Sequence, residues 1–324
     1  MQDFARYPDS GSRGPKVVAL GGGHGLYASL AALKLLTRNI TAVVTVGDDG
    51  GSSGRLRAEF GVLPPGDLRM ALAALCEDSE WGQTWRDVLQ YRFVSDGVLS
   101  GHSLGNLLIT GLWDLLEDPV AGLDWVGRLL NVKGRVVPMA NVPLQIEADI
   151  VTPDGTSATI TGQAAVAKCA AQITQLRLSP DNPPVCAEAL AAIDAADWII
   201  FGPGSWYTSV LPHLMVPQLY QALCQAKAKK LLVLNLIADF ETNEMSAADL
   251  VQTFHHAGPE LHLDAVLADF ASTAQTSALL DSVAQTGAIL CRRNIANPKQ
   301  LGSHDPLFLA AAYREIFGKF DLVR

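Results

Sequence analysis

The feature that most constrains the fold is a short apolar run that ends in a cluster of glycines near the start of the chain. Val17–Leu20 is uniformly apolar, and Gly21–Gly25 follows with four glycines. Residues 26–36 then carry apolar side chains at helical spacing, and residues 40–46 are rich in β-branched residues. A continuous apolar run of this length is typical of a strand that is buried on both faces. Together these segments predict a βαβ unit within a parallel sheet.

The same alternation returns in the second half of the chain. Residues 198–201, 231–236 and 265–268 are apolar and read as further buried strands. Amphipathic patterns between and around the strands predict helices at residues 67–76, 81–91, 103–116, 120–130, 187–196, 216–228 and 307–317, with another opening at Ser246. The sequence therefore predicts an α/β fold with a doubly wound, mainly parallel sheet.

One stretch departs from this texture. Residues 144–150 alternate strictly between apolar and polar side chains, and a turn signal separates them from a second strand candidate at residues 157–161. We therefore expect a smaller, largely antiparallel excursion over about residues 135–178. The domain organisation is then a flexible tail over residues 1–15, followed by a single domain over residues 16–324.

Composition and charge exclude several classes of protein. The chain has 324 residues and a formal net charge of −9, which argues against a general nucleic-acid or anionic-membrane surface. Any bound phosphate would need local arginines and backbone N–H groups. The five cysteines are widely spaced without a C-x-x-C pair, so reduced thiols are expected. No signal peptide and no apolar run long enough to span a membrane is evident, which predicts a cytoplasmic protein.

Two glycine loops follow predicted strands. Gly23–Ala28 fits the G-x-G-x-x-(G/A) fingerprint, in which glycines allow close backbone approach and a helix N-terminus faces a phosphate. Gly202–Ser209 follows the strand at residues 198–201 and adds hydroxyl groups. Ligands of open α/β sheets lie outside the carboxyl ends of the strands, so both loops are candidate phosphate sites. For the first loop, the alternative is a tight strand-to-helix turn that binds nothing.

A third loop follows the second predicted strand and contains two adjacent acids. Asp48 and Asp49 could hold Mg²⁺, accept hydrogen bonds from ribose hydroxyls or act as a base. Ser52, Ser53 and Arg55 could contact phosphate oxygens. The density of small and charged residues directly after a buried strand favours a site over a solvated surface loop.

Further candidates lie at later helix starts. Asp67 is equally a helix N-cap or a site residue, and Arg69 follows it in the first turn. His102 could serve as a general acid or base, or as a phosphate donor. The full set of candidate ligand residues is Gly21, Gly22, Gly23, His24, Gly25, Asp48, Asp49, Gly50, Gly51, Ser52, Ser53, Arg55, Asp67, Arg69, His102, Asn106, Gly202, Pro203, Gly204, Ser205, Tyr207, Thr208, Ser209 and Asn235.

Five of these segments, in order, resemble the YvcK branch of the CofD-like family, the gluconeogenesis factors. The segments are Gly-Gly-Gly-His-Gly (21–25), Thr-Val-Gly-Asp-Asp-Gly-Gly-Ser-Ser-Gly-Arg-Leu-Arg (45–57), Pro-Pro-Gly-Asp-Leu-Arg (64–69), Gly-His-Ser-Leu-Gly-Asn-Leu (101–107) and Gly-Pro-Gly-Ser-Trp-Tyr-Thr-Ser-Val-Leu-Pro (202–212). The likeness runs from about residue 16 to 256. Much of the family has Thr at the position of His24. A histidine there resembles the actinobacterial subgroup. Residues 239–242 keep only Glu241 and Thr242 of the usual Pro-Gly-Glu-Thr segment.

The resemblance implies a Rossmann-like fold and the binding of UDP-sugars, notably UDP-N-acetylglucosamine. It also implies a role in cell shape and in growth on gluconeogenic carbon sources, with glucosamine-6-phosphate synthase as a protein partner. The CofD relatives instead transfer a phospholactyl group to a deazaflavin alcohol with the help of a metal. In those relatives the acids after the second strand lie near the acceptor and the metal.

The main hypothesis is therefore a regulatory protein that binds a nucleotide sugar, with no required cofactor and with Mg²⁺ as an option at Asp48 and Asp49. The alternative is a phospholactyl transferase-like enzyme, for which Asp48, Asp49 and His102 are the catalytic candidates. An NAD(P)-dependent oxidoreductase rests on the glycine fingerprint alone. The sequence leaves the oligomeric state open, homo-oligomers included.

Overall fold

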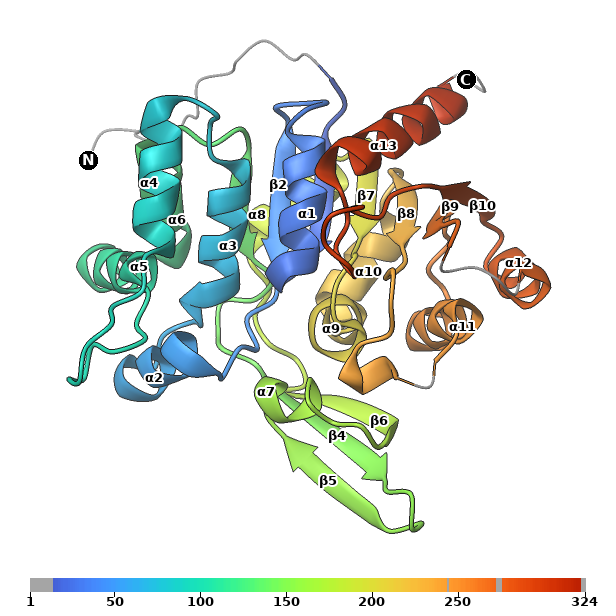
Figure 1. Cartoon of the computed structure of the whole chain (residues 1–324), viewed down its shortest axis with the longest axis horizontal. Helices are drawn as coiled ribbons and strands as arrows, with labels where there is room; N and C mark the ends of the chain where they lie inside the picture. Colours follow the sequence, from blue (N-terminus) through green and yellow to red (C-terminus); the bar gives the residue numbers. More distant parts are fainter. Residues whose placement is uncertain (1–13, 244, 272–275, 322–324) are drawn as a thin grey trace.

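A seven-stranded parallel sheet with helices on both faces forms the body of the molecule (Figure 1). The computed structural model describes residues 14–243, 245–271 and 276–321. The strand order is β10-β9-β8-β7-β1-β2-β3, and every neighbouring pair is parallel. The strands are β1 (Val17–Gly21), β2 (Ile40–Val44), β3 (Arg135–Pro138), β7 (Trp198–Phe201), β8 (Lys229–Val233), β9 (Ala265–Asp269) and β10 (Ile289–Arg293). The doubly wound α/β fold expected from the sequence is confirmed.

Helices connect the strands and cover the sheet. They are α1 (Gly23–Leu33), α2 (Gly51–Phe60), α3 (Pro65–Leu75), α4 (Glu80–Gln90), α5 (Leu104–Leu116), α6 (Pro119–Leu129), α8 (Ala187–Asp194), α9 (Pro212–Met215), α10 (Pro217–Gln225), α11 (Ala247–Ala257), α12 (Thr276–Gln285) and α13 (Pro306–Asp321), with a π-helical turn η1 (Trp206–Val210) and a 3₁₀ turn η2 (Phe240–Thr242). α1 packs between α3 and α13, in front of the sheet in Figure 1, and α8 lies behind it. Among the described helices, none combines the length and the apolar composition needed to cross a bilayer.

The path of the chain makes β1 the centre of the sheet. The chain leaves β1 toward β2 and β3 on one side, and then returns to β7 on the other side of β1. From β7 it continues outward through β8, β9 and β10. The junction between β1 and β7 is therefore the topological switch point, where doubly wound folds open a crevice at the carboxyl ends of the strands.

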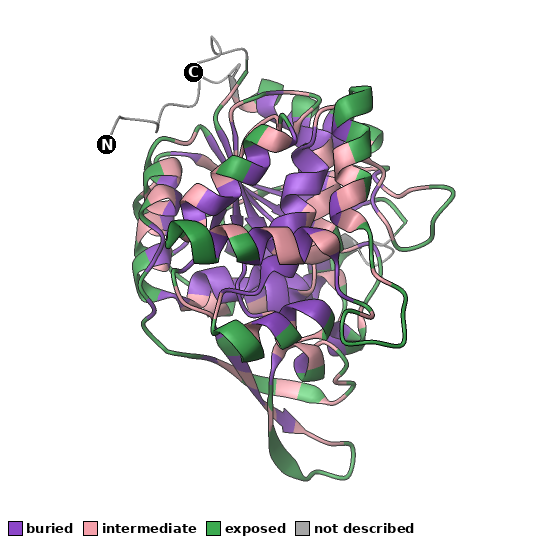
Figure 2. Cartoon of the chain, turned by 90° about the vertical axis from the view of Figure 1, so that its left-hand side faces the viewer, coloured by how far each residue is buried: buried purple, intermediate pink, exposed green. Residues whose placement is uncertain are grey.

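The core is continuous through the sheet, as Figure 2 shows by the purple colour of its interior. β1, β7 and β9 are buried along their whole length, because helices cover both faces of these central strands. The uniform apolar runs that predicted buried strands are explained by this two-sided cover.

A separate three-stranded antiparallel sheet projects from the carboxyl-terminal edge of the main sheet (Figure 1). This lobe contains β4 (Gln145–Val151), β5 (Ser157–Thr161), the short helix α7 (Gln163–Val166) and β6 (Gln172–Ser179), with β4 in the middle. Its lower boundary differs from the expected residue 135. Residues 135–138 form β3 and pair in parallel with β2, because Val136 and Val137 supply another short buried run at the edge of the main sheet.

Other elements differ from the sequence-based expectation. Residues 51–60 form helix α2, where the glycines and serines indicated a loop; burial of Ser52, Ser53 and Leu56 against neighbouring helices outweighs the weak helix propensity. α12 and β10 were not expected at all. The expected tail over residues 1–15 lies outside the described residues up to residue 13, and Gly14 and Pro15 accept hydrogen bonds from Asn39 and Thr37.

Candidate functional site

The two glycine loops lie side by side at the switch point. Gly21–Gly25 follows β1 and Gly202–Ser209 follows β7, and these two strands pair directly. The backbones of the loops are in contact: a Cβ atom added to Gly25 would lie 2.3 Å from the carbonyl oxygen of Pro203 and 2.5 Å from the Cα of Gly204. Glycine at position 25 is therefore required by this close approach. The structure brings together two loops that are far apart in the sequence.

An internal carboxylate lies at the start of α1. The backbone N–H of Gly23 and the hydroxyl of Thr45 donate to Asp67, the latter over 3.4 Å. One of the two interpretations of the sequence made Asp67 the N-cap of α3, and the structure shows that it is not. That position is held by Pro64, and Asp67 lies in the first turn with its side chain turned toward the glycine loop.

Burial, reinforced by the charge of Asp48, raises the pKa of the Asp67 carboxyl to about 7. The hydrogen bonds from Thr45 and Gly23 and the charge of Arg69 oppose this shift without cancelling it. Asp67 thus stays partly protonated near neutral pH, and it would become fully ionised in the presence of a suitable cation.

A second internal carboxylate lies at the start of η1, after the other glycine loop. Glu241 is 5% exposed, and its Oε1 accepts a hydrogen bond of 3.0 Å from the backbone N–H of Tyr207. Burial raises the pKa of Glu241 to about 7. The N-terminal donors of α1 and η1, which the sequence assigned to a phosphate, are therefore shared with acids of the protein itself.

Asn235, at the end of β8, holds the second glycine loop in place. Its Oδ1 accepts a hydrogen bond of 3.0 Å from Gly204 N–H, and its Nδ2 donates to the carbonyl oxygen of Gly204 over 2.9 Å. The amide therefore satisfies both backbone groups of one glycine. The structure places Asn235 next to the site as a support for the loop.

The adjacent acids Asp48 and Asp49 point to different neighbours. Asp49 is exposed and accepts a hydrogen bond of 2.9 Å from Ala164 N–H in the lobe. Asp48 accepts one of 3.0 Å from Gly50 N–H, and its charge acts on Asp67. Asp48 therefore lies near enough to Asp67 for its charge to raise the pKa of that group, whereas Asp49 contacts the lobe.

Asp48 and Asp67 supply carboxylate oxygens of the kind that bind a divalent cation, as do Asp48 and Asp49, the pair expected from the sequence. Mg²⁺ is usually bound by one or two carboxylates together with ligand phosphates. Burial and the charge of Asp48 raise the pKa of Asp67, and a bound divalent cation would oppose both effects. No group of three or more His, Cys, Asp or Glu side chains arranged for a metal occurs among the described residues. A site here would therefore depend on oxygen atoms of a ligand.

Ser52, Ser53 and Arg55 make contacts within the protein. The hydroxyl of Ser53 accepts a hydrogen bond of 3.0 Å from Gly66 N–H at the start of α3. Arg55 is exposed, and its guanidinium donates to the carbonyl oxygens of Val98 and Ser100 in the loop before α5. These residues join α2 to its neighbours, whichever ligand the site accepts.

Arg69, His102 and Asn106 come together around Ser52. Arg69 Nε donates to Asn106 Oδ1 over 2.8 Å, and Asn106 Nδ2 donates to Ser52 Oγ over 3.0 Å. Ser52 Oγ also lies 3.0 Å from His102 Nδ1. Burial, followed by the charge of Arg55, lowers the pKa of His102, which favours the neutral imidazole.

Most of the sequence candidates fall into three groups in the structure. Gly21, Gly22, Gly23, Gly25, Asp48, Asp67, Gly202, Pro203, Gly204, Ser209 and Asn235 lie around the switch point. Arg69, His102, Asn106 and Ser52 form a polar group at the start of α5. Asp49 faces the lobe. The sequence did not single out Thr45 or Gln163, although Thr45 is a polar residue directly after a buried strand and Gln163 approaches Gly47.

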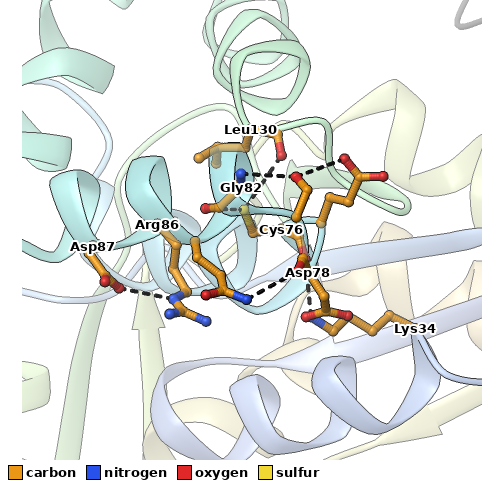
Figure 3. Close-up of polar contacts among 10 residues, drawn as sticks. Lys34, Cys76, Asp78, Gly82, Arg86, Asp87 and Leu130 are labelled. Carbon is orange, nitrogen blue, oxygen red and sulfur yellow. Dashed lines mark hydrogen bonds and ion pairs between the residues drawn. The ribbon is translucent and has the colours of Figure 1, made fainter.

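The opposite end of α3 carries no candidate chemistry (Figure 3). Cys76 donates from Sγ to the carbonyl oxygen of Gly82 over 2.9 Å, and Lys34 forms an ion pair with Asp78 beside it. Burial raises the pKa of the Cys76 thiol, which keeps it protonated and unreactive. All five cysteines are free thiols, as expected, and Cys76, Cys186 and Cys291 are buried.

The fold and the position of the glycine loops define a doubly wound α/β protein with its candidate site at the switch point. Residues 17–303 match the family described as 2-phospho-L-lactate transferase CofD, so the chain belongs to the CofD family. A crystal structure of a UPF0052-family protein from Bacillus halodurans has a TM-score of 0.81 and 34% identity, covering 93% of this chain and 99% of that one.

Curated relatives are gluconeogenesis factors. The Bacillus subtilis gluconeogenesis factor is 39% identical over 246 residues, 75% of each chain, and the Halalkalibacterium halodurans one is 41% identical over 244 residues, 75% of this chain and 74% of that one. A Mycobacterium leprae protein with a provisional form of the same name is 54% identical over 227 residues, 69% of this chain. The match spans 63% of the Mycobacterium leprae protein, less than two thirds of its length.

Proposed function

We propose that the protein is a regulatory protein that binds a nucleotide sugar of the UDP-N-acetylglucosamine class at the switch point. The observation that carries the proposal is that both glycine loops follow the two strands that flank this point, β1 and β7. Doubly wound folds bind nucleotides in this crevice, with the diphosphate on glycine-rich turns. The likeness to gluconeogenesis factors supports a role in carbon metabolism.

Electrostatics add a requirement for a cation. A diphosphate at the start of α1 would lie beside Asp67 and Asp48, and the repulsion between these anions would oppose binding. Asp48 and Asp67 would hold Mg²⁺, which would neutralise both the acids and the ligand phosphates. Nucleotide-sugar binding is therefore expected to depend on Mg²⁺, a change from the sequence-based view that no cofactor is required.

Calorimetric titration tests this proposal. The ligands are UDP-N-acetylglucosamine, UDP and free N-acetylglucosamine, each with and without Mg²⁺. We expect binding of the first two with Mg²⁺, and none of the free sugar. Asp67→Asn should weaken Mg²⁺-dependent binding at least tenfold, because it removes one of the two carboxylates. Asp87→Asn, an exposed aspartate on α4 that pairs with Arg86, is the matched control.

Two results would reject the proposal. One is the absence of heat with every nucleotide at millimolar concentration in the presence of Mg²⁺. The other is equal affinity in wild type and Asp67→Asn, which would place the ligand elsewhere even if binding occurs.

A phospholactyl transferase is the second candidate, and the family match together with the Asp48–Asp67 pair favours it. Incubation with the deazaflavin alcohol, a lactyl-diphosphoguanosine donor and Mg²⁺ would give a phospholactyl product that mass spectrometry detects. Product that disappears in Asp48→Asn would establish the enzyme and displace the regulator. If the protein is instead a regulator, it has no turnover to lose, and Asp48→Asn would change ligand affinity alone.

The wider role follows from the same ligand. A protein that senses UDP-N-acetylglucosamine in the cytoplasm would adjust the supply of cell-envelope precursors and thereby cell shape during gluconeogenic growth. Glucosamine-6-phosphate synthase is the candidate protein partner, and self-association is an open alternative. Co-purification of the synthase with wild type, and its loss in the ligand-binding variant Asp67→Asn, would support this role.

A further inference from the structure

A buried arginine without a full set of partners lies close to the switch point. Arg69 is 3% exposed, and its Nε donates to Asn106 Oδ1. Its Nη1 atom is buried and has no hydrogen-bond partner among the described residues. A buried guanidinium with an unpaired donor is costly, because its charge has lost water without gaining an anion. Burial accordingly lowers the pKa of Arg69 to about 10.

Two further arginines lie in this part of the molecule, Arg92 near Arg69 and Arg55 near His102. The charge of Arg92 lowers the pKa of Arg69, and that of Arg55 lowers the pKa of His102. None of these three arginines forms an ion pair with a described residue. The charges of Asp67 and Asp48 act on Arg69 in the opposite direction, but neither carboxylate forms an ion pair with it, so its guanidinium has no direct anionic partner among the described residues.

The polar groups around Arg69 present donors. Ser52 Oγ accepts hydrogen bonds from Asn106 Nδ2 and, over 3.4 Å, from Ser103 N–H. Because a hydroxyl has one proton, that proton goes to His102 Nδ1, 3.0 Å away. Neutral His102 therefore carries its own proton on Nε2, as a donor.

The start of α5 adds its positive end to this group. The N-cap residue Ser103 does not cap the helix with its side chain, since its hydroxyl donates to the carbonyl oxygen of Leu89. Asn106 lies in the first turn of this helix. A helix start of this kind favours an anion, and the unpaired Nη1 of Arg69 lies beside it.

We propose that Arg69, Asn106 and His102 form a binding subsite for a phosphate group. Arg69 would pair with the phosphate through its free Nη1, and His102 and the start of α5 would add further donors. A phosphate dianion would compensate the positive charge that the protein leaves unpaired there. The phosphate could belong to the nucleotide ligand or to a separate phosphorylated small molecule. The subsite does not rest on the identity of the nucleotide.

The position of Arg69 explains why both sources deserve a test. Arg69 follows Asp67 by two residues in the first turns of α3. Asp67 turns toward the glycine loop, whereas Arg69 turns toward α5. One extended ligand could reach both side chains, and two smaller ligands could each occupy one of them.

Inorganic phosphate is the probe, measured by thermal unfolding and calorimetry at pH 7.5 without Mg²⁺, with chloride at equal ionic strength as the reference. We expect phosphate to bind wild type and raise its melting temperature. Arg69→Met keeps the volume of the side chain and removes the charge. It should weaken phosphate binding about 10- to 100-fold, as expected for a charge-assisted contact. Arg86→Met, on the surface of α4, is the matched control.

The same variants separate a ligand contact from a structural role. If Arg69 is kept for a ligand, Arg69→Met without phosphate should melt at or above the temperature of wild type, because it removes an unpaired buried charge. Asn106→Asp should give Arg69 an internal anion, raise the melting temperature and abolish the phosphate response. Because this second variant is expected to be more stable, it keeps the test decisive if Arg69→Met does not fold.

The outcomes are unambiguous. A phosphate response equal in wild type, Arg69→Met and Asn106→Asp overturns the proposal, as does the absence of any response in wild type. Competition between phosphate and UDP-N-acetylglucosamine identifies the nucleotide as the source of the phosphate. Simultaneous binding of both identifies a separate phosphorylated molecule. Failure of the nucleotide alone would reject the proposed function and leave this subsite standing.

Discussion

Asp49 Oδ1 accepts a hydrogen bond of 2.9 Å from the backbone N–H of Ala164, which belongs to the first turn of α7 in the lobe. The contact joins the loop after β2 to a segment more than a hundred residues further along the chain. Gly162, which precedes α7, has φ of 104° and leaves no room for a Cβ atom, which would lie 2.1 Å from Asp49 Oδ2. The lobe is thus attached directly to the loop that carries Asp48.

Asp49→Ala should loosen the lobe while leaving the proposed Mg²⁺ site at Asp48 and Asp67 intact. One hydrogen bond of this kind contributes about 0.5–1.5 kcal/mol to stability. Its loss should therefore accelerate amide exchange in α7 about 2- to 10-fold. Hydrogen-exchange mass spectrometry measures this change. Asp154→Ala, in the exposed turn between β4 and β5, is the control. Unchanged exchange in α7 would show that Asp49 does not hold the lobe.

The stability of Asp67→Asn relative to wild type should increase as the pH rises. The folded-state pKa of about 7 exceeds the ordinary value of 3.8 for an aspartate, so the folded protein binds this proton more tightly than the unfolded chain does. Its contribution to wild-type stability is therefore fully present below about pH 4 and is lost as the pH rises to about 7. The melting temperature of Asp67→Asn relative to wild type should increase between pH 5 and pH 8. A relative melting temperature that stays flat or falls over this range would contradict the assignment.

Two substitutions at Glu241 distinguish the loss of a hydrogen bond from the loss of a charge. Glu241→Gln retains an acceptor for Tyr207 N–H and removes a carboxylate whose pKa burial raises to about 7, so it should match or exceed wild-type stability at pH 8. Glu241→Ala leaves that N–H unpaired and should cost about 1–3 kcal/mol. Denaturant unfolding of both variants at pH 8 distinguishes the two effects. Equal destabilisation by both would mean that the ionised carboxylate itself supports η1.

Gly25→Ala should destabilise the protein severely, because its Cβ would meet the backbone of Pro203 and Gly204. Gly111→Ala is the matched control. Gly111 lies within α5, where an added Cβ would meet no atom within 4 Å apart from the adjacent residues and backbone of its own helix, and alanine there should stabilise the helix by about 0.5–1 kcal/mol. Denaturant unfolding of the two variants measures the contrast. A tolerated Gly25→Ala would show that the two glycine loops are not held against each other.

The sequence by itself determined the fold class and most of the central strands, but not the edge strands β3 and β10. Uniform apolar runs such as residues 17–20 and 198–201 identify strands that are buried on both faces, and the glycines after them identify the carboxyl edge of the sheet. The strict alternation of residues 144–150 identified the half-exposed lobe, and β4 buries every second residue as that pattern requires. These features can be recognised within a single segment, because successive side chains of a strand point to opposite faces of the sheet.

Only the tertiary structure decided which polar residues meet. The sequence grouped Asp48 with Asp49 because they are neighbours, whereas in the fold the charge of Asp48 acts on Asp67 and Asp49 accepts a hydrogen bond from Ala164. Glu241 reaches Tyr207 across the ends of two strands. Such contacts depend on how helices and loops converge at the switch point. The pattern of residues along one segment does not predict which side chains of a distant segment will contact it.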